Sequence, residues 1–226
     1  PVAGLGAMEF TGLRNYELAI TDPLLWKSLG NTVWLAIAGG IPQHLVAVPV
    51  AYLLVSAVRG RLRHFYGATM FVPYITSTVA VSLIFYTIYS ANAGVLNQAL
   101  VWLSTLPGIG FFFSWVPEAM PIRWLGKSDL LKPSIAFVVF WKYVGFNVVL
   151  YSAGFLTVPQ DLYDAAKVDG CSPWRQFWNV ALPMIRPFIF FAVTLTLIGQ
   201  MQLFEEPFVL TNGDSGGVAQ AGLTAA

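Results

Sequence analysis

Charged residues are scarce in this chain, and their scarcity argues against a water-soluble fold. Asp, Glu, Lys and Arg make up 10% of the 226 residues and apolar types 57%, whereas soluble domains average roughly 25% and 45–50%. The mean hydropathy is +0.67. A chain of this size cannot bury so much apolar surface, so we expect it to lie in a lipid bilayer. The net charge of +1, without a basic stripe, gives no reason to expect nucleic acid as a partner.

Cysteine and histidine are also rare. Cys171 is the single cysteine and the chain has 2 histidines, so it has neither an internal disulfide nor a cluster with metal-ligand spacing. The sequence contains no Walker loop, no Gly-x-Ser-x-Gly elbow and no HExxH motif. We therefore expect no metal, no cofactor and no catalytic residues, so that any energy for work comes from partner proteins.

Four long apolar runs are present instead. Each can cross about 30 Å of hydrocarbon, which takes about 20 helical residues. They cover residues 30–58, 65–91, 134–158 and 188–210. Only helices satisfy the backbone polar groups of such segments in lipid, and packed membrane helices tolerate prolines such as Pro42, Pro49 and Pro73 as kinks. We therefore expect an all-α, polytopic membrane protein in which residues 1–226 form one transmembrane domain.

The distribution of Lys and Arg predicts the orientation of these spans. The connector 59–64 carries three arginines, and the segment 159–187 carries Lys167, Arg175 and Arg186. If the spans alternate, both lie on one side, which the positive-inside rule makes cytoplasmic. Basic residues are sparser on the other side: Arg14, Lys27, Arg123, Lys127 and Lys132. The connector 92–132 would then be extracytoplasmic, with aromatic residues for anchoring at the membrane interface or, alternatively, for contact with a ligand or partner: Trp102, Phe111, Phe112, Phe113, Trp115 and Trp124.

The polar segment 159–187 predicts two short helices joined by a turn. Pro159 can open a helix, Asp161 and Asp164 suit its positive end, and Gly170 supplies a left-handed stop. A second helix would start at an N-cap serine followed by proline, and would run to the next proline: Ser172, Pro173, Trp174, Phe177, Trp178 and Pro183. Such an elbow can dock onto a soluble partner; the alternative is an amphipathic connector lying on the membrane.

The spacing within this segment resembles the EAA loop of permease subunits in binding-protein-dependent ABC importers. The matching residues are Asp164, Ala165, Ala166, Gly170, Val180, Leu182 and Pro183. The likeness continues in Trp141, Lys142, Gly145, Phe146, Asn147 and Pro159, and in residues 204–211, which are similar to carbohydrate-uptake permeases of the MalF kind. Three departures stand out: Asp164 replaces the usual Glu, Val180 replaces the common Ile, and residues 212–217 replace an expected Gly-Gly-Pro.

The resemblance implies a subunit of an ATP-driven importer in a bacterial or archaeal plasma membrane. Its partners would be a second permease subunit, two ATP-binding subunits and an extracytoplasmic solute-binding protein. Coupling to the ATPase would involve Asp164 as an acidic contact, the small side chains of Ala165 and Ala166, and Asp169 and Gly170 at the turn. A six-helix core is implied, of which this chain would supply the second to fifth spans, so we expect a fragment of a longer subunit.

Polar side chains within spans are candidates for the substrate pathway, because they are costly in lipid and usually face an interior or a wet cavity. Thr196 and Gln200 lie four residues apart, and helical spacing would continue this stripe in the same run. The candidates are Asn147, Tyr151, Gln200, Gln202, Glu205 and Glu206, with Trp141 and Phe204 as nearby aromatic groups. Such a set suits a sugar, although the amides could merely bridge helices.

Two further polar residues have open interpretations. Lys142 either pairs with Glu205 or Glu206 or extends toward the membrane surface. His44 is expected to form a hydrogen bond between helices rather than to relay protons. The function that we expect is import of a sugar or related polyol. The alternatives are a permease for a non-sugar solute and a membrane-embedded enzyme that uses Glu205, Glu206 and Lys142.

Overall fold

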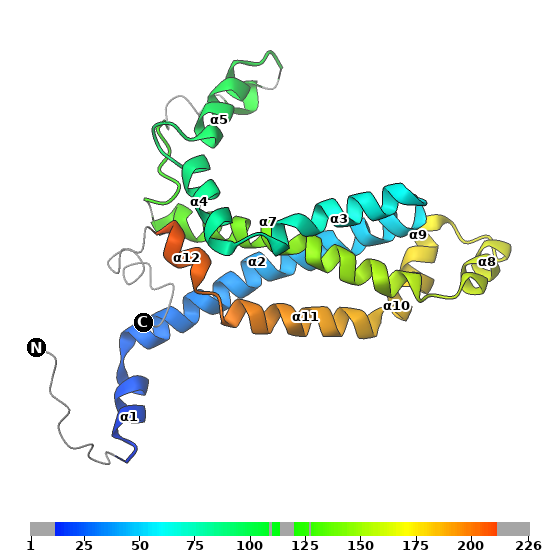
Figure 1. Cartoon of the computed structure of the whole chain (residues 1–226), viewed down its shortest axis with the longest axis horizontal. Helices are drawn as coiled ribbons and strands as arrows, with labels where there is room; N and C mark the ends of the chain where they lie inside the picture. The colour runs from blue at the N-terminus through cyan, green and yellow to red at the C-terminus, as the bar shows by residue number, and fades with distance from the viewer. Residues whose placement is uncertain (1–11, 109, 114–119, 127, 212–226) are drawn as a thin grey trace, which may run out of the picture.

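Four helices run side by side along the long axis of the molecule and form a bundle (Figure 1). The structure is a computed structural model that describes residues 12–108, 110–113, 120–126 and 128–211, within which all regular secondary structure is helical. The bundle consists of α2 (Pro23–Ser56), α3 (Arg61–Ile75), α7 (Ser128–Leu156) and α11 (Arg186–Met201). The expected all-α membrane fold is confirmed. Trp115, Lys127 and residues 212–217 lie outside the described residues.

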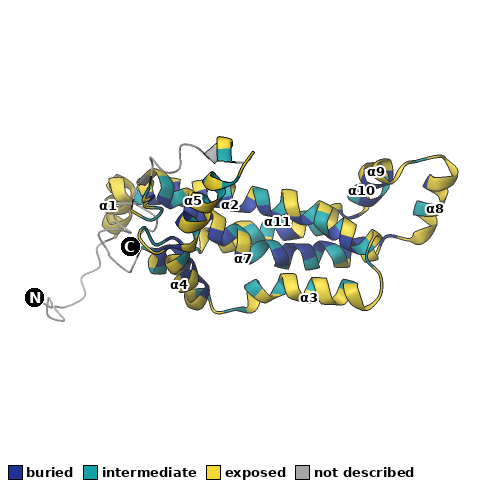
Figure 2. Cartoon of the chain, turned by 90° about the horizontal axis from the view of Figure 1, so that it is seen from above, coloured by how far each residue is buried: buried dark blue, intermediate teal, exposed yellow. Residues whose placement is uncertain are grey.

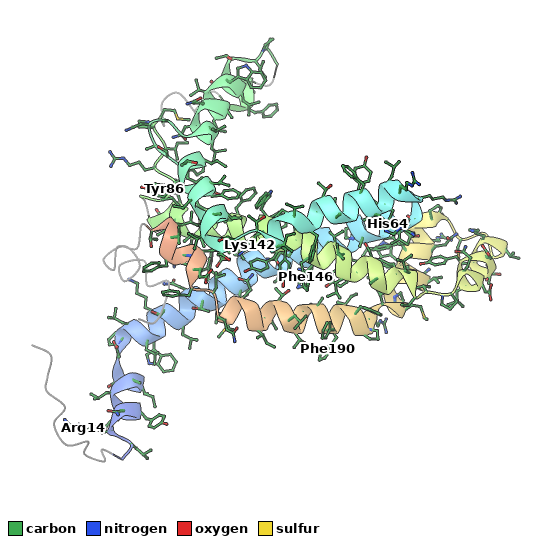
Figure 3. The ribbon with its side chains drawn as sticks, viewed as in Figure 1. Arg14, His64, Tyr86, Lys142, Phe146 and Phe190 are labelled. Carbon is green, nitrogen blue, oxygen red and sulfur yellow. The ribbon has the colours of Figure 1, made fainter. Side chains whose placement is uncertain are left out.

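The shorter helices gather at the two ends of this bundle (Figure 1). One end carries α8 (Gln160–Val168), α9 (Pro173–Gln176), η2 (Phe177–Ala181) and α10 (Leu182–Met184). The other carries α1 (Arg14–Thr21), α4 (Thr78–Ile88), α5 (Val95–Thr105), η1 (Gly110–Phe113) and α12 (Glu205–Leu210). His64 lies at the end of the bundle that carries α8, α9 and α10, and Arg14 lies at the far end (Figure 3). The loops 59–64 and 159–187 therefore share one end, as predicted for spans that alternate in direction.

Two helices are long and apolar enough to cross a membrane, namely α2 and residues Asp129–Leu156 of α7. The first and third apolar runs are thus confirmed as single helices, although α2 begins earlier than expected, where Asp22 accepts a hydrogen bond from the Leu24 amide. Pro42 and Pro49 lie inside α2 without ending it. Packed membrane helices tolerate such prolines because neighbouring groups can satisfy the backbone carbonyls that a proline leaves unpaired.

The second apolar run is not one helix, so that prediction is wrong. α3 ends at Ile75 and α4 begins at Thr78, with a bend of 90° between them. Thr76 has extended backbone (ψ 144°), and its side chain donates to the Val72 carbonyl over 2.8 Å. The Thr76 amide donates to the same carbonyl over 3.2 Å, so Thr76 caps the end of α3 with both its backbone and its side chain.

The fourth run is also interrupted. α11 ends at Met201 and α12 begins at Glu205, so the expected continuous helix over 188–210 is wrong as well. On its other side α11 makes a bend of 69° with the Pro173–Met184 segment. If each bent pair counts as one span, the chain has up to four spans, which agrees with the number expected from the sequence.

Burial follows the inner faces of the bundle, whereas much of the outer apolar surface is exposed and suits lipid (Figure 2). Small residues bring the helices close together. A Cβ added at Gly145 of α7 would lie 1.7 Å from the Met70 carbonyl oxygen of α3, and one at Gly154 would lie 2.9 Å from the Phe188 ring of α11. Close approach at small residues is how helices gain packing energy in lipid, where the hydrophobic effect does not draw them together.

Candidate functional site

A cavity of about 200 Å³ opens between the four bundle helices. Every helix of the bundle contributes to its wall. The lining residues are Gln43 of α2, Tyr74 of α3, Tyr143, Phe146 and Asn147 of α7, Leu195, Thr196, Gly199 and Gln200 of α11, and Leu203 beyond α11. A ligand in this cavity would therefore contact the whole bundle.

Three amide side chains in the cavity wall are almost completely buried. Gln43, Asn147 and Gln200 expose 0%, 1% and 4% of their surface. Asn147 donates its Nδ2 to Gln43 Oε1 over 3.2 Å. Among the described residues, no hydrogen-bond partner is found for Gln43 Nε2, Asn147 Oδ1 or Gln200 Oε1. Buried polar atoms of this kind are normally satisfied, so the cavity offers one donor and two acceptors to water or a ligand.

Aromatic side chains also line this cavity and give part of its wall an apolar surface. The rings of Tyr74 and Phe146 are stacked, with centroids 4.6 Å apart and planes at 25°. Tyr143 meets Tyr74 edge to face at 5.9 Å. Convergent amides beside aromatic faces are typical of a site for a small molecule that carries both hydroxyl groups and apolar ring faces.

The structure brings some of the predicted pathway residues to this cavity and leaves others elsewhere. Asn147, Gln200 and Thr196 line it. Tyr151 is buried in the core of the bundle instead, where its hydroxyl lies 2.6 Å from His44 Nδ1. That contact between α7 and α2 confirms the expectation that His44 forms a hydrogen bond between helices.

The predicted polar stripe does not continue past Met201, because α11 ends there. Gln202 and Phe204 lie at the break and line a separate hollow of about 300 Å³ against the first turns of α2. Glu205 is exposed, and Glu206 is buried in an ion pair. None of these residues lines the cavity that contains Asn147 and Gln200.

Lys142 pairs with Glu206, which confirms one of the two interpretations. Lys142 Nζ lies 2.9 Å from Glu206 Oε1, and the two side chains expose 3% and 4% of their surface. Tyr143 donates to the same carboxylate oxygen over 3.1 Å, and Lys142 also donates to the Thr78 hydroxyl. The pair joins α7 to α4 and α12, the helices that follow the two breaks (Figure 3).

Sequence reasoning missed several lining residues. Gln43 is absent from the residues that the sequence predicts for the pathway, although an amide within an apolar run is a usable signal. Tyr74, Tyr143 and Phe146 gave no such signal, because aromatic side chains are common in membrane helices wherever they point. Their grouping became visible only when α3 and α7 were placed together.

The segment 159–187 folds as two helices around a turn, as predicted. Gly170 has φ +73°, and the amide of Cys171 donates to the Ala166 carbonyl over 2.9 Å, which is the left-handed Schellman stop. Ser172 Oγ accepts from the Arg175 amide over 3.4 Å, and Pro173 occupies the first turn. The π-helical turn η2 was not predicted. We name residues 160–171 the α8 elbow.

The surface of the α8 elbow differs from the expectation in two respects. Asp164 lies in the middle of α8 rather than at its positive end, and its carboxylate accepts from Lys167 Nζ at 2.8 Å and Gln160 Nε2 at 3.3 Å. These hydrogen bonds hold the pKa of Asp164 below its ordinary value, so the group is a carboxylate at neutral pH. Ala165 is exposed but Ala166 is buried, so the two alanines do not form one exposed face.

The remainder of the segment anchors the elbow to the bundle. Phe177, Ala181 and Ile185 belong to the same buried cluster as residues of α2 and α7. Tyr52 of α2 donates to the Pro173 carbonyl over 3.5 Å, and its ring centroid lies 4.9 Å from that of Phe177. A force on the α8 elbow would therefore reach the bundle through packed side chains.

Comparison with known proteins gives a consistent result. Residues 45–213 match the family described as the inner membrane component of binding-protein-dependent transport systems. The lactose transport system permease protein LacF of Rhizobium radiobacter is 31% identical over 98% of this chain and 70% of its own length. A probable ABC transporter permease protein of Bacillus subtilis, YurN, is 30% identical over 92% of this chain and 67% of its own length.

Comparison of structures supports the same fold. The crystal structure of a bacterial alginate ABC transporter, in complex with an alginate pentasaccharide-bound periplasmic protein, has a chain that matches with a TM-score of 0.76 at 19% identity. The match covers 94% of this chain and 68% of that one. The family consists of multi-pass permeases of the inner membrane and not of enzymes, so the alternative of a membrane-embedded enzyme is wrong. This chain belongs to the family of inner membrane permease components of binding-protein-dependent ABC importers.

Proposed function

We propose that this chain forms part of the translocation pathway for a sugar or a related polyol, and that the cavity between the four bundle helices is a position where the solute rests. The observation that carries this proposal is the set of unpaired amide atoms on Gln43, Asn147 and Gln200 beside the stacked rings of Tyr74 and Phe146. Sugar hydroxyls both donate and accept, so they can satisfy all three atoms, and the apolar faces of a sugar ring can pack on the aromatic side chains.

The names of relatives are consistent with this substrate class. Besides the lactose permease protein LacF, an arabinooligosaccharides transport system permease protein of Bacillus subtilis is 30% identical over 94% of this chain. A trehalose/maltose transport system permease protein of Thermococcus litoralis is 28% identical over 92% of this chain. A different solute class is represented by an osmoprotective compounds uptake permease protein of Synechocystis, which is 28% identical.

The partners that this function requires are a second permease subunit, two ATP-binding subunits and an extracytoplasmic solute-binding protein. The α8 elbow is the surface that we assign to the ATP-binding subunits. Asp164, Ala165, Asp169 and Gly170 are exposed there, whereas Phe177, Ala181 and Ile185, which follow the elbow, are packed into the bundle. Mechanical coupling between the ATP-binding subunits and the bundle needs an exposed surface for contact and a buried segment that transmits the movement, and this segment has both. The loops 59–64 and 159–187 would then face the cytoplasm.

A pair of matched amide substitutions tests the cavity. The full-length subunit and its partners are reconstituted in proteoliposomes, and uptake of labelled di- and oligosaccharides, a polyol and an amino acid is measured with the binding protein present. Gln200→Leu should lower sugar uptake by about 10-fold or more, because it removes an acceptor for a buried hydroxyl. Gln202→Leu, outside the cavity, should change uptake less than twofold.

Equal losses in both variants would contradict the cavity as the position where the solute rests. Uptake of the amino acid with no uptake of any saccharide or polyol would contradict the proposed substrate class and leave the non-sugar alternative standing. ATPase activity measured in parallel shows whether a variant has assembled, since unassembled complexes would lose uptake and hydrolysis together.

A further inference from the structure

A second groove lies on the outside of the bundle, at the end that carries the loop 59–64. Its volume is about 360 Å³, and it runs between α3 on one side and α2 and α7 on the other. The lining is largely apolar or small: Leu54, Gly67, Ala68, Phe71, Val149, Ser152, Ala153 and Leu156, with Arg63 and His64 at one end. α3 is exposed along much of its length here (Figure 2).

The mouth of this groove is positively charged. Arg63 and His64 line it, and Arg59 and Arg61 immediately precede them. Within the part of the chain that the structure describes, Arg63 takes part in neither of the ion pairs Lys142–Glu206 and Lys167–Asp164 and has no carboxylate partner. The first turn of α3 also begins without a side-chain cap. A helix N-terminus and an unpaired guanidinium both favour an anion at this position.

We propose that this groove binds an anionic phospholipid, with the phosphate of the headgroup at Arg63 and His64 and an acyl chain along Gly67, Ala68 and Phe71. Two features together identify the occupant. The apolar floor would gain nothing from a free phosphate ion, and the basic mouth would gain nothing from an uncharged apolar helix. Basic pockets beside membrane helices at the level of the headgroups are suited to acidic lipids.

The floor of the groove offers a variant that blocks the acyl chain without disturbing the helix. A Cβ added at Gly67 meets no atom within 4 Å, so a larger side chain there enters the groove and not the packed interface with α7. Leucine is also a better helix former than glycine. Gly67→Leu should therefore fold while filling the space that the chain of a lipid would occupy.

The test is lipid retention by the full transporter complex. The purified complex is exchanged into neutral detergent with phosphatidylglycerol or phosphatidylcholine, and the bound lipid is counted by native mass spectrometry. We expect phosphatidylglycerol to be retained in preference to phosphatidylcholine. Arg63→Gln should weaken that retention about fivefold, the value for one basic residue near an anionic lipid surface. Gly67→Leu should abolish it.

Two matched controls make this test specific. Arg175→Gln removes the same charge at the same end of the bundle, at a residue of α9 that does not line the groove, and Gly30→Leu adds the same side chain at an open position on α2. Both should retain phosphatidylglycerol as the wild type does. Retention of both lipids alike, unchanged retention in Arg63→Gln and Gly67→Leu, or displacement of the lipid by inorganic phosphate alone would each overturn the proposal.

Discussion

Lys142 and Glu206 illustrate how strongly two side chains can constrain a membrane protein. Lys142 Nζ lies 2.9 Å from Glu206 Oε1, and both side chains are almost completely buried. Either charge would be costly at this position without the other. The Thr78 hydroxyl accepts a hydrogen bond from Lys142, and the Tyr143 hydroxyl donates one to Glu206. Because these groups come from different helices, the pair holds α4 and α12 in place against α7.

The first prediction follows from the cost of leaving one of these charges alone. Lys142→Met should destabilise the protein by about 3–5 kcal/mol, since it leaves the Glu206 carboxylate buried without a cation. Lys142→Met combined with Glu206→Leu should restore most of that loss, because both charges are then absent. Chemical unfolding in mixed micelles measures these differences as a double-mutant cycle.

Glu205 provides the control for this cycle. It has the same charge as Glu206 and directly precedes it in the chain but is exposed, so Lys142→Met combined with Glu205→Leu should be no more stable than Lys142→Met alone. A rescue by the Glu205 substitution, or additive losses for Lys142 and Glu206, would show that the buried pair does not act as described.

The sequence left open whether Lys142 has a partner and which glutamate that partner would be. Rarity within an apolar run identified Asn147 and Gln200 as interior residues, because amide groups avoid lipid. The choice of Glu206 depends on how the chain turns after Met201, and helical periodicity had been extended across that turn. A single-residue error in the phase of a helix rotates its side chains by about 100°, which is enough to exchange Glu205 and Glu206 as the residue that faces inward.

At the scale of the helices, the contact between α3 and α7 depends on one glycine. A Cβ at Gly145 would lie 1.7 Å from the Met70 carbonyl oxygen, which is backbone and cannot rotate away. Gly145→Ala should therefore force the two helices apart and destabilise the protein by about 1–3 kcal/mol or more. Gly67→Ala on α3 should not destabilise it, since a Cβ there meets open space. Thermal unfolding of both variants tests the difference, and equal melting temperatures would contradict it.

The turn of the α8 elbow supports a prediction about coupling. Gly170 has φ +73°, and a Cβ added there would meet no atom within 4 Å, so within this chain a substitution acts through the backbone. Gly170→Leu should disfavour the left-handed turn by roughly 1–2 kcal/mol, whereas Gly170→Asn should be tolerated. We expect the leucine variant to hydrolyse more ATP per solute imported. Normal stoichiometry in a folded, assembled Gly170→Leu transporter would contradict the proposed role of the elbow.

The elements were predictable where local chemistry decides them. The start of α9 at Ser172 and Pro173 and the stop at Gly170 follow from caps and turn conformations that a few neighbouring residues determine. The breaks after Ile75 and Met201 do not follow from local chemistry, because average hydropathy over a run of apolar residues hides a short polar interruption. Those breaks depend on tertiary partners, such as the ion pair of Lys142, that the sequence does not place.

The whole molecule has two chemically different ends, and this asymmetry leads to the last prediction. The end with loop 59–64 and the α8 elbow is basic and carries the proposed contacts with ATP-binding subunits and acidic lipid. The opposite end carries α5 and η1 with exposed aromatic residues such as Trp102 and Phe112 (Figure 1). The positive-inside rule makes the basic end cytoplasmic.

Single cysteines at the two ends test this orientation directly. Cys171 is the chain's single cysteine and is partly exposed on the α8 elbow, so a membrane-impermeant maleimide should label it in inside-out vesicles and not in intact cells. Phe112→Cys in a Cys171→Ser background should show the reverse pattern. If Cys171 reacted in intact cells and Cys at 112 did not, the α8 elbow could not reach cytoplasmic ATP-binding subunits and the coupling proposal would fail. The cavity between the bundle helices would still stand in that case, because its amides and aromatic rings do not depend on which end faces outward.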